Sequence, residues 1–483
     1  MSASAAGASV PSKRRLRQRI VVAYGFGAVA YGVKDAGFGT FLLLFYNQVI
    51  GLPSTTVGAV IMAALLIDAL VDPAVGFFSD RTRSRWGRRH PWMYASALPI
   101  MIGYVLLWNP PAGEVAALAW LFVCAVGVRT AVSAYEVPSV ALTPELSSDY
   151  DERTRILAWR YLWGWAGGLA MGLAAWLYFL APTPEFANGM LNREGYRGYA
   201  IAGALLMGFA ILVSAAGTHR EIPHLPQPGP DRPSLGASFR ELGETLRNKA
   251  FVVLMLASLC AYTNQGVAYA LGNYVNGYVW GFQPRDFVVI TLLYFVSAGA
   301  AFVIAPRLGR LGNKPTVAAV AVMTGAALVT TPYWLRVLGW APAGGDPAAI
   351  GLVMLTSVGG TAFNITGFIL GASMMADVVE DSEVRTGRRS EGVFFAGAFF
   401  IQKCTSGVGI FIAGLMLALA GFPDRAVPGQ VPAAALDRLS LVYAATYLTL
   451  ACLAAFMFTR FPFGRAEHEA RLVTLGAEAE PRR

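Results

Sequence analysis

The chain has 483 residues, of which 55% are hydrophobic and only 14% charged, and its mean hydropathy is +0.51. Soluble domains carry roughly 25% charged residues, so this composition excludes an ordinary soluble protein and indicates a chain that lies largely in lipid. A net charge of +9 is also found in nucleic-acid-binding proteins. Here the bases lie in short segments between apolar stretches, so no nucleic-acid partner is expected.

Apolar windows long enough to cross a membrane recur along the whole chain. A hydrocarbon core of ~30 Å needs about 20 apolar residues per helix. Twelve such windows fit, which predicts an all-α membrane protein with twelve transmembrane helices. We expect the crossings at Ile20–Asn47, Thr55–Ser79, Trp92–Trp108, Val115–Leu142, Ile156–Leu180, Tyr199–Gly217, Phe251–Trp280, Phe287–Pro306, Pro315–Leu338, Ala348–Val379, Gly392–Gly421 and Leu439–Phe461.

The loops between these crossings alternate between basic and nearly base-free. Bases gather in the tail and in Ser12–Arg19, Arg81–His90, Asp151–Arg160, His219–Lys249, Arg307–Lys314 and Arg385–Arg389. Because Lys and Arg accumulate on the cytoplasmic side, both termini are predicted to be cytoplasmic. The protein is then integral to a plasma membrane, the inner membrane if the source is bacterial. The first apolar run contains Lys34 and Asp35, so it is a transmembrane helix and not a cleaved signal.

No pattern of catalytic or cofactor-binding residues appears. Cys124, Cys260, Cys404 and Cys452 all fall in predicted helices without metal-ligand spacing, so neither a disulfide nor a metal site is expected. The chain has no P-loop, no HExxH helix and no GxSxG turn, and its four histidines fall in predicted cytoplasmic segments. We therefore expect no enzyme and no cofactor. A non-transporting membrane receptor is a remote alternative.

The chain divides into two halves of six crossings each. The polar segment that separates them, Thr218–Lys249, is rich in proline at its start and then predicts an amphipathic helix at Leu235–Leu246. Each half has a basic, glycine-containing turn between its second and third crossings, which suggests a duplicated unit. This is the arrangement of major facilitator transporters, which bind substrate between the halves. The predicted units are 1–217, a linker at 218–248, and 249–483.

Two acids in the second crossing require a compensating charge. Asp68 and Asp72 are four residues apart, so a helix places them on one face, about 6 Å apart at Cβ. Two ionised carboxylates there repel by ~2 to 3 kcal/mol at an effective dielectric of 20. We predict that they hold a cation or a proton between them. The alternative is that one or both pair with a basic residue purely for packing.

Further charges lie inside other crossings. Lys34 and Asp35 are adjacent in the first crossing, so we expect them to point to different faces, where they cannot simply neutralise each other and one of them faces the cavity. Glu136 precedes Pro138 deep in the fourth crossing, and Lys403 lies in the middle of the eleventh. A buried lysine is more often a counter-ion for an acid than a nucleophile, so Lys403 is predicted to balance the acids.

The basic run after the second crossing predicts a gate at the cytoplasmic surface. We expect Asp80, Arg81, Arg85 and Arg88 to anchor the helix ends and to bond helix termini and acids in the opposite half. The alternative, which does not exclude a gate, is that these arginines only set the orientation of the chain in the membrane.

These segments resemble a known family. The run DPAVGFFSDRTRSRWGRRHPW, with Asp68 before it, is similar to the signature of the glycoside-pentoside-hexuronide:cation symporters, the melibiose-permease-like branch of the major facilitator superfamily. The resemblance extends to Lys34–Asp35, to Glu136-Val137-Pro138 with the DERTRILAWR segment after it, and to Met374–Phe395 followed by Lys403. It therefore covers nearly the whole chain.

The resemblance implies a role for each of these residues. Asp68 and Asp72 match acids that coordinate the coupling cation, Na⁺ or H⁺, and Glu136 matches an acid between the cation and sugar sites. Asp35 matches an acid that bonds sugar hydroxyls, with Arg160 as its companion, and Lys403 matches a lysine near the cation site. Two departures weaken the match: the fourth-helix acid is Glu where melibiose permease has Asp, and the spacing before Arg160 is shorter.

The resemblance implies a symporter that works by alternating access, and it favours a sugar or glycoside as substrate. Lys34 and Trp159 are further candidates for substrate binding, although Trp159, Trp163 and Trp165 can equally face lipid. The same fold also occurs in symporters of lysophosphatidylcholine, so a lysophospholipid or another amphiphile is the alternative substrate. We expect a monomer whose other partners are the coupling cation and membrane lipid.

Overall fold

The computed structural model describes residues 16–147, 149–186, 188–225, 236, 243, 245–386 and 391–463. Within these ranges all regular secondary structure is helical, and no strand occurs. Most of the predicted amphipathic helix at Leu235–Leu246, part of the basic segment Arg385–Arg389 and both ends of the chain lie outside the described residues.

The first half begins with a helix that changes its winding along its length. It consists of α1 (Gln18–Phe26), α2 (Val29–Ala36), the π-helical η1 (Gly37–Phe41), α3 (Leu42–Leu44) and the π-helical η2 (Phe45–Val49). The helices that follow are α4 (Ser54–Arg81), α5 (His90–Leu107), α6 (Glu114–Leu146), α7 (Tyr150–Ala174) continued by η3 (Ala175–Phe179), and α8 (Arg193–His219), with short 3₁₀ turns at η4 (Gly189–Leu191) and η5 (Ile222–His224).

The second half has a similar series of long helices. They are α10 (Lys249–Tyr274) continued by η6 (Val275–Val279), α11 (Pro284–Leu311), α12 (Lys314–Val337), α13 (Pro347–Thr386), α14 (Glu391–Ala420) and α15 (Ala433–Thr459). Several helices begin where polar side chains satisfy the free backbone N–H groups: Asp149 accepts from Glu152, Asn192 from Glu194, and Asn248 from Phe251.

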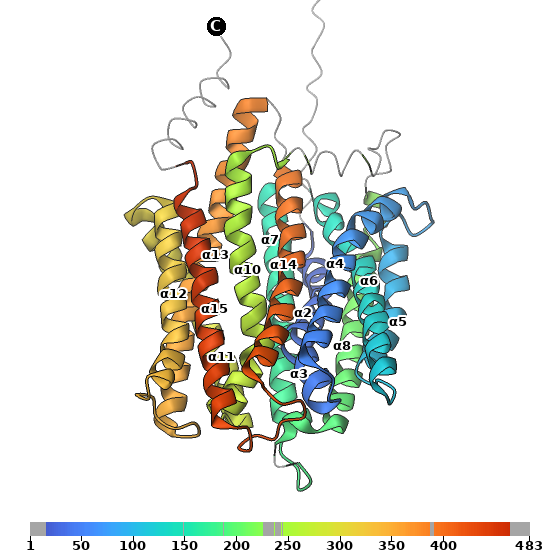
Figure 1. The fold of residues 1–483 in the computed structure, drawn as a ribbon. Helices are drawn as coiled ribbons and strands as arrows, with labels where there is room; N and C mark the ends of the chain where they lie inside the picture. The colour runs from blue at the N-terminus through green and yellow to red at the C-terminus, as the bar shows by residue number, and fades with distance from the viewer. Residues whose placement is uncertain are drawn as a thin grey trace, which may run out of the picture.

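Each predicted crossing coincides with one of these helices, because the length of an apolar run limits the length of a crossing. Several helices extend about six or seven residues beyond the predicted bounds, as at the starts of α7, α8 and α15 and the end of α13. Ten helical segments in the described chain are long and apolar enough to span a membrane. The other two predicted crossings, α5 and α7, lie in the same bundle as the rest (Figure 1) but are not among the ten. The count of twelve therefore stays a prediction, whereas the all-helical membrane architecture is confirmed.

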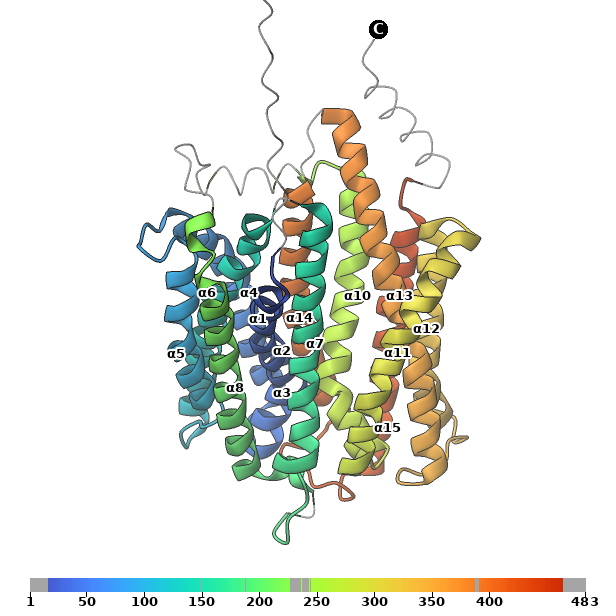
Figure 2. The ribbon, with the colours of Figure 1, turned by 180° about the vertical axis from the view of Figure 1, so that it is seen from behind.

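The helices form two groups, and α14 lies where the groups meet. In both views α5 lies at one edge and α12 at the opposite edge (Figures 1 and 2). Helix α14 of the second half packs along α4 of the first, and α10 packs against η1. We call the end of the bundle that carries Arg85–Arg89 the inner end and the end that carries 421–432 the outer end, after the orientation that the charge pattern predicts.

The two groups are bridged at the outer end by hydrogen bonds and stacked rings. The Asn47 amide donates to Asp424 at 2.5 Å, and the Tyr274 hydroxyl donates to the Asn47 oxygen at 2.9 Å. The indole of Trp176 stacks on Phe287 with ring centres 4.1 Å apart. Desolvation raises the pKa of Asp424, and the hydrogen bond from Asn47 acts in the opposite direction. The outer end is therefore closed by contacts between the halves.

Glycines set the close approach of α2 and α7. A Cβ atom on Gly32 would overlap the carbonyl oxygen of Gly164, and one on Gly167 would lie 2.8 Å from the Cα atom of Val29. Small residues allow membrane helices to pack backbone to backbone, since van der Waals contact and not hydrophobicity holds helices together in lipid. This packing sets the depth at which α2 carries Lys34 and Asp35 past α7.

We therefore expect Gly32→Ala to destabilise the protein. The added methyl group has no space against Gly164, and overpacking of this kind costs about 1 to 3 kcal/mol. The matched control is Gly172→Ala on α7, where a Cβ atom would meet nothing within 4 Å. Thermal unfolding in detergent should show a lower midpoint for Gly32→Ala alone. Equal midpoints for the two variants would contradict this account of the contact between α2 and α7.

Candidate functional site

Eight charged side chains from five helices meet in the interior of the bundle. We call them the charge cluster: Lys34 and Asp35 of α2, Asp68 and Asp72 of α4, Arg129 and Glu136 of α6, Arg160 of α7, and Lys403 of α14. The ion pairs among them join each of these helices but α2 to a neighbouring helix.

Asp68 is the most completely bonded acid of the cluster. The Arg129 guanidinium donates to Asp68 Oδ2 twice, from Nη2 at 2.7 Å and from Nε at 3.1 Å, and the Ser133 hydroxyl donates to Oδ1 at 2.8 Å. Lys403 Nζ lies 3.4 Å from Oδ2. The carboxylate is only 3% exposed, and a buried charge is tolerated when it is paired and hydrogen-bonded in this way.

Lys403 lies between the two acids of α4. Its ammonium group bonds Asp72 Oδ2 and forms the longer pair with Asp68. The i, i+4 spacing thus places both carboxylates toward one cation, and that cation is a side chain of the other half. Asp72 Oδ1 is buried and has no hydrogen-bond partner within the described chain.

Glu136 and Arg160 form a looser pair between α6 and α7. Arg160 Nη2 lies 3.7 Å from Glu136 Oε1, and Arg160 Nη1 donates to the Ser139 hydroxyl at 2.8 Å. Tyr24 holds this region from α1, because its hydroxyl donates to the Ser139 carbonyl at 2.6 Å. Sequence reasoning expected Arg160 to accompany Asp35. The ion pair of Arg160 is instead with Glu136, which lies on the adjacent helix.

Lys34 and Asp35 correct a second expectation. They were expected to diverge, but Lys34 Nζ lies 2.6 Å from Asp35 Oδ1. Adjacent helical residues do leave the backbone in different directions, yet the long, flexible lysine chain reaches back to its neighbour. Lys34 is 3% exposed, whereas the Asp35 side chain is 50% exposed. Asp35 is therefore the member of the pair that solvent, and any solute, can reach.

Tyr269 of α10, with Gln265 bonded to it, lies against the first crossing near Gly39. Tyr269 is within electrostatic range of the Asp35 carboxylate, and its ring lies 3.5 Å from a Cβ position at Gly39. The Gln265 amide donates to the Tyr269 hydroxyl at 3.4 Å. Trp159, the aromatic candidate on α7, is half-buried, and its backbone packs against Gly25 of α1. An exposed acid within electrostatic range of a phenol can bind hydroxyl groups.

The cluster is electrically balanced. Its four acids and four bases pair as Lys34 with Asp35, Arg129 with Asp68, Lys403 with Asp72, and Arg160 with Glu136. In the described part of the chain, no three His, Cys, Asp or Glu side chains gather closely enough to hold a metal ion. The arrangement is therefore a chain of ion pairs, and its exposed members are the ones that can exchange partners.

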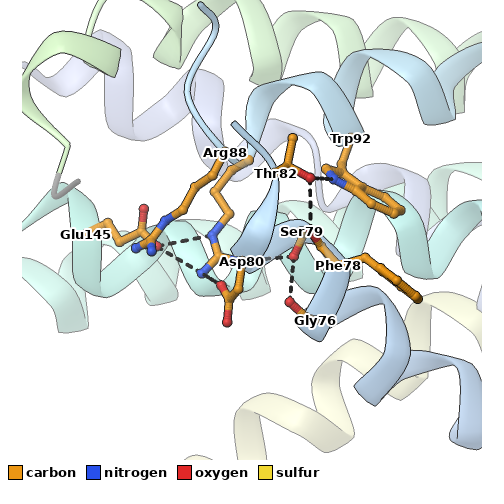
Figure 3. A network of polar contacts seen from close by, with 9 residues as sticks. Gly76, Phe78, Ser79, Asp80, Thr82, Arg88, Trp92 and Glu145 are labelled. Carbon is orange, nitrogen blue, oxygen red and sulfur yellow. Dashed lines mark hydrogen bonds and ion pairs between the residues drawn. The ribbon is translucent and has the colours of Figure 1, made fainter. Parts of the chain in front are cut away.

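The inner end carries a second network, which joins α4, α5 and α6 (Figure 3). Glu145 Oε1 accepts from Arg88 at 2.6 Å and from Arg89 at 3.0 Å, and Arg89 also pairs with Asp80 at 2.5 Å and donates to Ser79 at 3.0 Å. This acid lies in the same half as the arginines. Arg88 and Arg89 thus bond an acid of their own half, at the end of α6, and the expected bonds of the gate to acids of the opposite half stay a prediction.

The other predicted gate residues lie on aromatic rings. The guanidinium of Arg81 lies 3.4 Å from the centre of the Phe77 ring, and that of Arg85 lies 5.5 Å from that of Trp86. Such contacts let an arginine cover apolar surface while its charge stays near water. Within the N-terminal half, these two residues therefore contribute to the surface of the inner end.

The second half repeats the pairing at the corresponding turn. Lys314 at the start of α12 bonds both oxygens of Asp377 on α13, at 3.0 and 3.1 Å. In the first half, the base just before α5 likewise bonds an acid near the inner end of α6. The same base-to-acid contact after the same kind of turn supports the interpretation of a duplicated unit.

The residues of these networks that were not predicted from the sequence include Arg129, Ser133, Arg89 and Glu145. The first two were detectable, because Arg129, Ser133 and Glu136 follow one another at helical spacings of four and three on α6. An arginine inside an apolar run meets the same criterion that selected the acids. Arg89 lies within the basic run that was singled out, whereas its pairing with Glu145 required the path of the chain.

Comparison with known proteins identifies the family. The model of the family described as MFS/sugar transport protein matches residues 23–465. The chain belongs to this family. Members of the major facilitator fold are transporters and not enzymes, so the expectations of that fold, of an integral membrane protein and of no catalysis are confirmed.

Relatives of this MFS chain include proteins with different substrates. It is 25% identical to an uncharacterized symporter of Synechocystis over 87% of this chain and 88% of that protein. It is 24% identical to the isoprimeverose transporter of Lactiplantibacillus pentosus, over 83% and 80%. It is 26% identical to the sodium-dependent lysophosphatidylcholine symporter 1-A of Danio rerio, over 95% and 88%.

A solved structure supports the same fold for the MFS chain. The inward open form of the xylose transporter XylE from E. coli superposes with a TM-score of 0.61 at 13% identity, over 94% of this chain and 99% of that one. At this identity the likeness shows the fold alone.

The inner network generates a stability prediction. Glu145→Gln removes the carboxylate charge that Arg88 and Arg89 share and leaves Arg89 with its pair to Asp80, at a cost of about 3 to 5 kcal/mol for a broken buried pair. The control is Glu194→Gln, whose pair with Arg197 is largely exposed and contributes about 0 to 1 kcal/mol. Thermal unfolding should separate the two variants. An equal fall of the unfolding midpoint in both variants would show that the network does not stabilise the fold.

Proposed function

We propose that the protein is a cation-coupled symporter that carries a small polar solute, a sugar or glycoside, by alternating access between its two halves. One observation carries the proposal: Lys403 of α14, in the second half, pairs with Asp68 and Asp72 of α4, in the first. A charge contact that spans the halves can link their relative position to the ionic state of the acids. Na⁺ and H⁺ are both candidates for the coupling ion.

The coupling follows from competition for one carboxylate. A cation that reaches Asp72 takes the place of Lys403, so it changes the contact between α14 and α4. If the substrate favours the same arrangement of the halves, cation and substrate each strengthen the binding of the other, and by equal factors. Glu136, which pairs with Arg160, is proposed to act between the cation-binding acids of α4 and the sugar-binding candidate Asp35, as the resemblance implies.

The substrate class rests on the surroundings of Asp35. A half-exposed carboxylate, the Tyr269 hydroxyl and the Gln265 amide offer both acceptors and donors to adjacent hydroxyl groups. Arg160 Nη2 is buried and has no hydrogen-bond partner within the described chain, so it is available to bond an oxygen of the solute. Lys34 and Trp159 complete the candidate set. The similarity to the isoprimeverose transporter agrees with this choice.

A lysophospholipid is the second candidate, because the chain is also similar to a lysophosphatidylcholine symporter. On α7, Tyr161, Leu162 and Trp165 are more than half exposed. This apolar surface suits an acyl chain, and it suits bilayer lipid equally well. We expect the protein to act as a monomer in the membrane, with the units 1–217 and 249–483 as the halves that move.

Uptake by proteoliposomes tests the function. The purified protein is reconstituted, and accumulation of labelled pentosides, hexosides and lysophosphatidylcholine is measured under an imposed Na⁺ gradient, an imposed H⁺ gradient and neither. Accumulation of a sugar with either gradient supports the proposal. Accumulation of lysophosphatidylcholine alone selects the amphiphile. No gradient-dependent accumulation of any solute would favour a receptor.

The acids of α4 are predicted to be necessary for coupling. Asp72→Asn removes the carboxylate charge that bonds Lys403, and Asp68→Asn removes the second carboxylate charge that Lys403 contacts. Both substitutions should therefore abolish uphill uptake. Equilibrium substrate binding or cation-independent exchange should persist in part, because the ion pairs of Asp68 and Asp72 in the described residues are with Arg129 and Lys403 and not with Asp35. Concentrative uptake at the normal rate in both variants would contradict the assignment of these acids.

Asp35 is predicted to contribute to affinity for sugar. Asp35→Ala should weaken binding by roughly tenfold or more, since each lost bond from a buried partner costs about 1 to 3 kcal/mol. The control is Asp437→Ala, whose side chain is similarly exposed at 53% but lies at the start of α15. Substrate titration at saturating Na⁺, and separately at low pH, measures both. A lysolipid, bound mainly through its tail at ~0.8 kcal/mol per CH₂, would tolerate this change.

A further inference from the structure

We propose that Arg129 is a resident cation that occupies Asp68, so that this acid takes no Na⁺ from solution and a Na⁺ gradient does not drive the transporter. The inference deepens the proposed function by choosing between its two coupling ions, and it rests on that function only for the transport readout. Ion binding by the purified protein tests it separately.

Both carboxylate oxygens of Asp68 already accept hydrogen bonds from side chains. Oδ2 accepts from Arg129 Nη2 at 2.7 Å and from Nε at 3.1 Å, and it faces Lys403 Nζ at 3.4 Å. Oδ1 accepts from the Ser133 hydroxyl at 2.8 Å. A hard cation needs several oxygen atoms directed at it at once. Here both carboxylate oxygens are directed at donors, and the serine hydroxyl uses its hydrogen on the carboxylate.

The positive charge of Arg129 is fixed at Asp68. A guanidinium stays protonated in proteins, and this one is 5% exposed and attached to α6, so it does not leave as a dissolved ion does. Its guanidinium carbon also lies 5.4 Å from the centre of the Phe38 ring in η1. Arg129 is thus held from two sides, by the acid of α4 and by the aromatic ring of the first crossing.

The neighbouring acids Asp72 and Glu136 are also paired with bases. Asp72 is bonded by Lys403, and Glu136 faces Arg160, so each candidate cation ligand has a basic side chain as its partner. No set of three acids converges anywhere in the described residues to form a cage for a metal ion. A Na⁺ ion placed at Asp68 would lie beside both Arg129 and Lys403, and it would meet repulsion where it needs ligands. Within the proposed symport, this leaves H⁺ as the coupling ion.

The experiment begins with the unmodified protein in detergent. Binding of radioactive Na⁺ is measured at equilibrium, and thermal unfolding is compared in NaCl and in choline chloride at equal ionic strength. We expect no saturable Na⁺ binding and no difference between the unfolding midpoints. In proteoliposomes, a Na⁺ gradient should leave uptake unchanged. Saturable Na⁺ binding, or uptake that rises with the Na⁺ gradient, overturns the proposal without any variant.

Two substitutions test whether Arg129 is the cause. Arg129→Ser removes the resident charge and adds a hydroxyl oxygen beside Asp68, so it should create saturable Na⁺ binding and a higher unfolding midpoint in NaCl. Arg129→Lys keeps the charge and should stay insensitive to Na⁺. A folded Arg129→Ser protein without Na⁺ binding overturns the assignment. If Arg129→Ser does not fold, Arg129→Gln takes its place, because glutamine keeps a hydrogen-bond donor for Asp68. A folded Arg129→Gln protein should then bind Na⁺ saturably, and the absence of such binding overturns the assignment.

The outcomes separate the two proposals. Failure of every gradient to drive uptake removes the symport function, but it leaves the comparison of Na⁺ binding between the unmodified protein and its variants intact. Conversely, uptake driven by Na⁺ retains the symport function and removes the role of Arg129.

Discussion

Charge in the interior of the bundle must be neutralised pair by pair, and this constraint determines much of the rest of the structure. Isolated ions are costly inside the membrane, so intramembrane acids and bases are found together. The four acids of the charge cluster are matched by four bases, and all of these pairs but Lys34 with Asp35 join different helices. The helices must therefore pass one another at set depths, which the glycines between α2 and α7 permit.

The pairs differ in what they connect. Arg129 with Asp68 and Arg160 with Glu136 lie within the first half, whereas Lys403 joins the second half to it. The pairs inside one half can stay formed when the halves move. The outer end, by contrast, is joined by hydrogen bonds of Asn47 and by the stacked rings of Trp176 and Phe287, which break at lower cost because most of these groups are neutral. Lys403 is thus the charged contact between the halves at the cluster.

The sequence predicted the helices well and the side-chain pairs only in part. Crossing bounds follow from apolar length. The spacing of Asp68 and Asp72 correctly placed both acids on one helix face, which Lys403 contacts, whereas their binding of a coupling cation stays a prediction. Helical periodicity predicts the direction in which a Cβ atom points, but not where the end of a long side chain lies. The bond between Lys34 and Asp35 was therefore not predicted. The partner of Arg160 depended on how α6 packs against α7, which no local pattern records. Arg129, in contrast, was predictable, because it lies inside an apolar run at helical spacing from Ser133 and Glu136.

Electrical balance in the cluster also bears on the energetics of the proposed transport. With all eight groups ionised, the empty carrier has no net charge at the cluster, so its return across the membrane does no work against the potential. One bound cation and a neutral solute make the loaded cluster positive by one charge. The membrane potential then contributes ~2.3 kcal/mol per 100 mV to the loaded step alone. An unbalanced cluster would divide that energy between the two steps, so pairing every acid directs the driving force to the step that carries substrate.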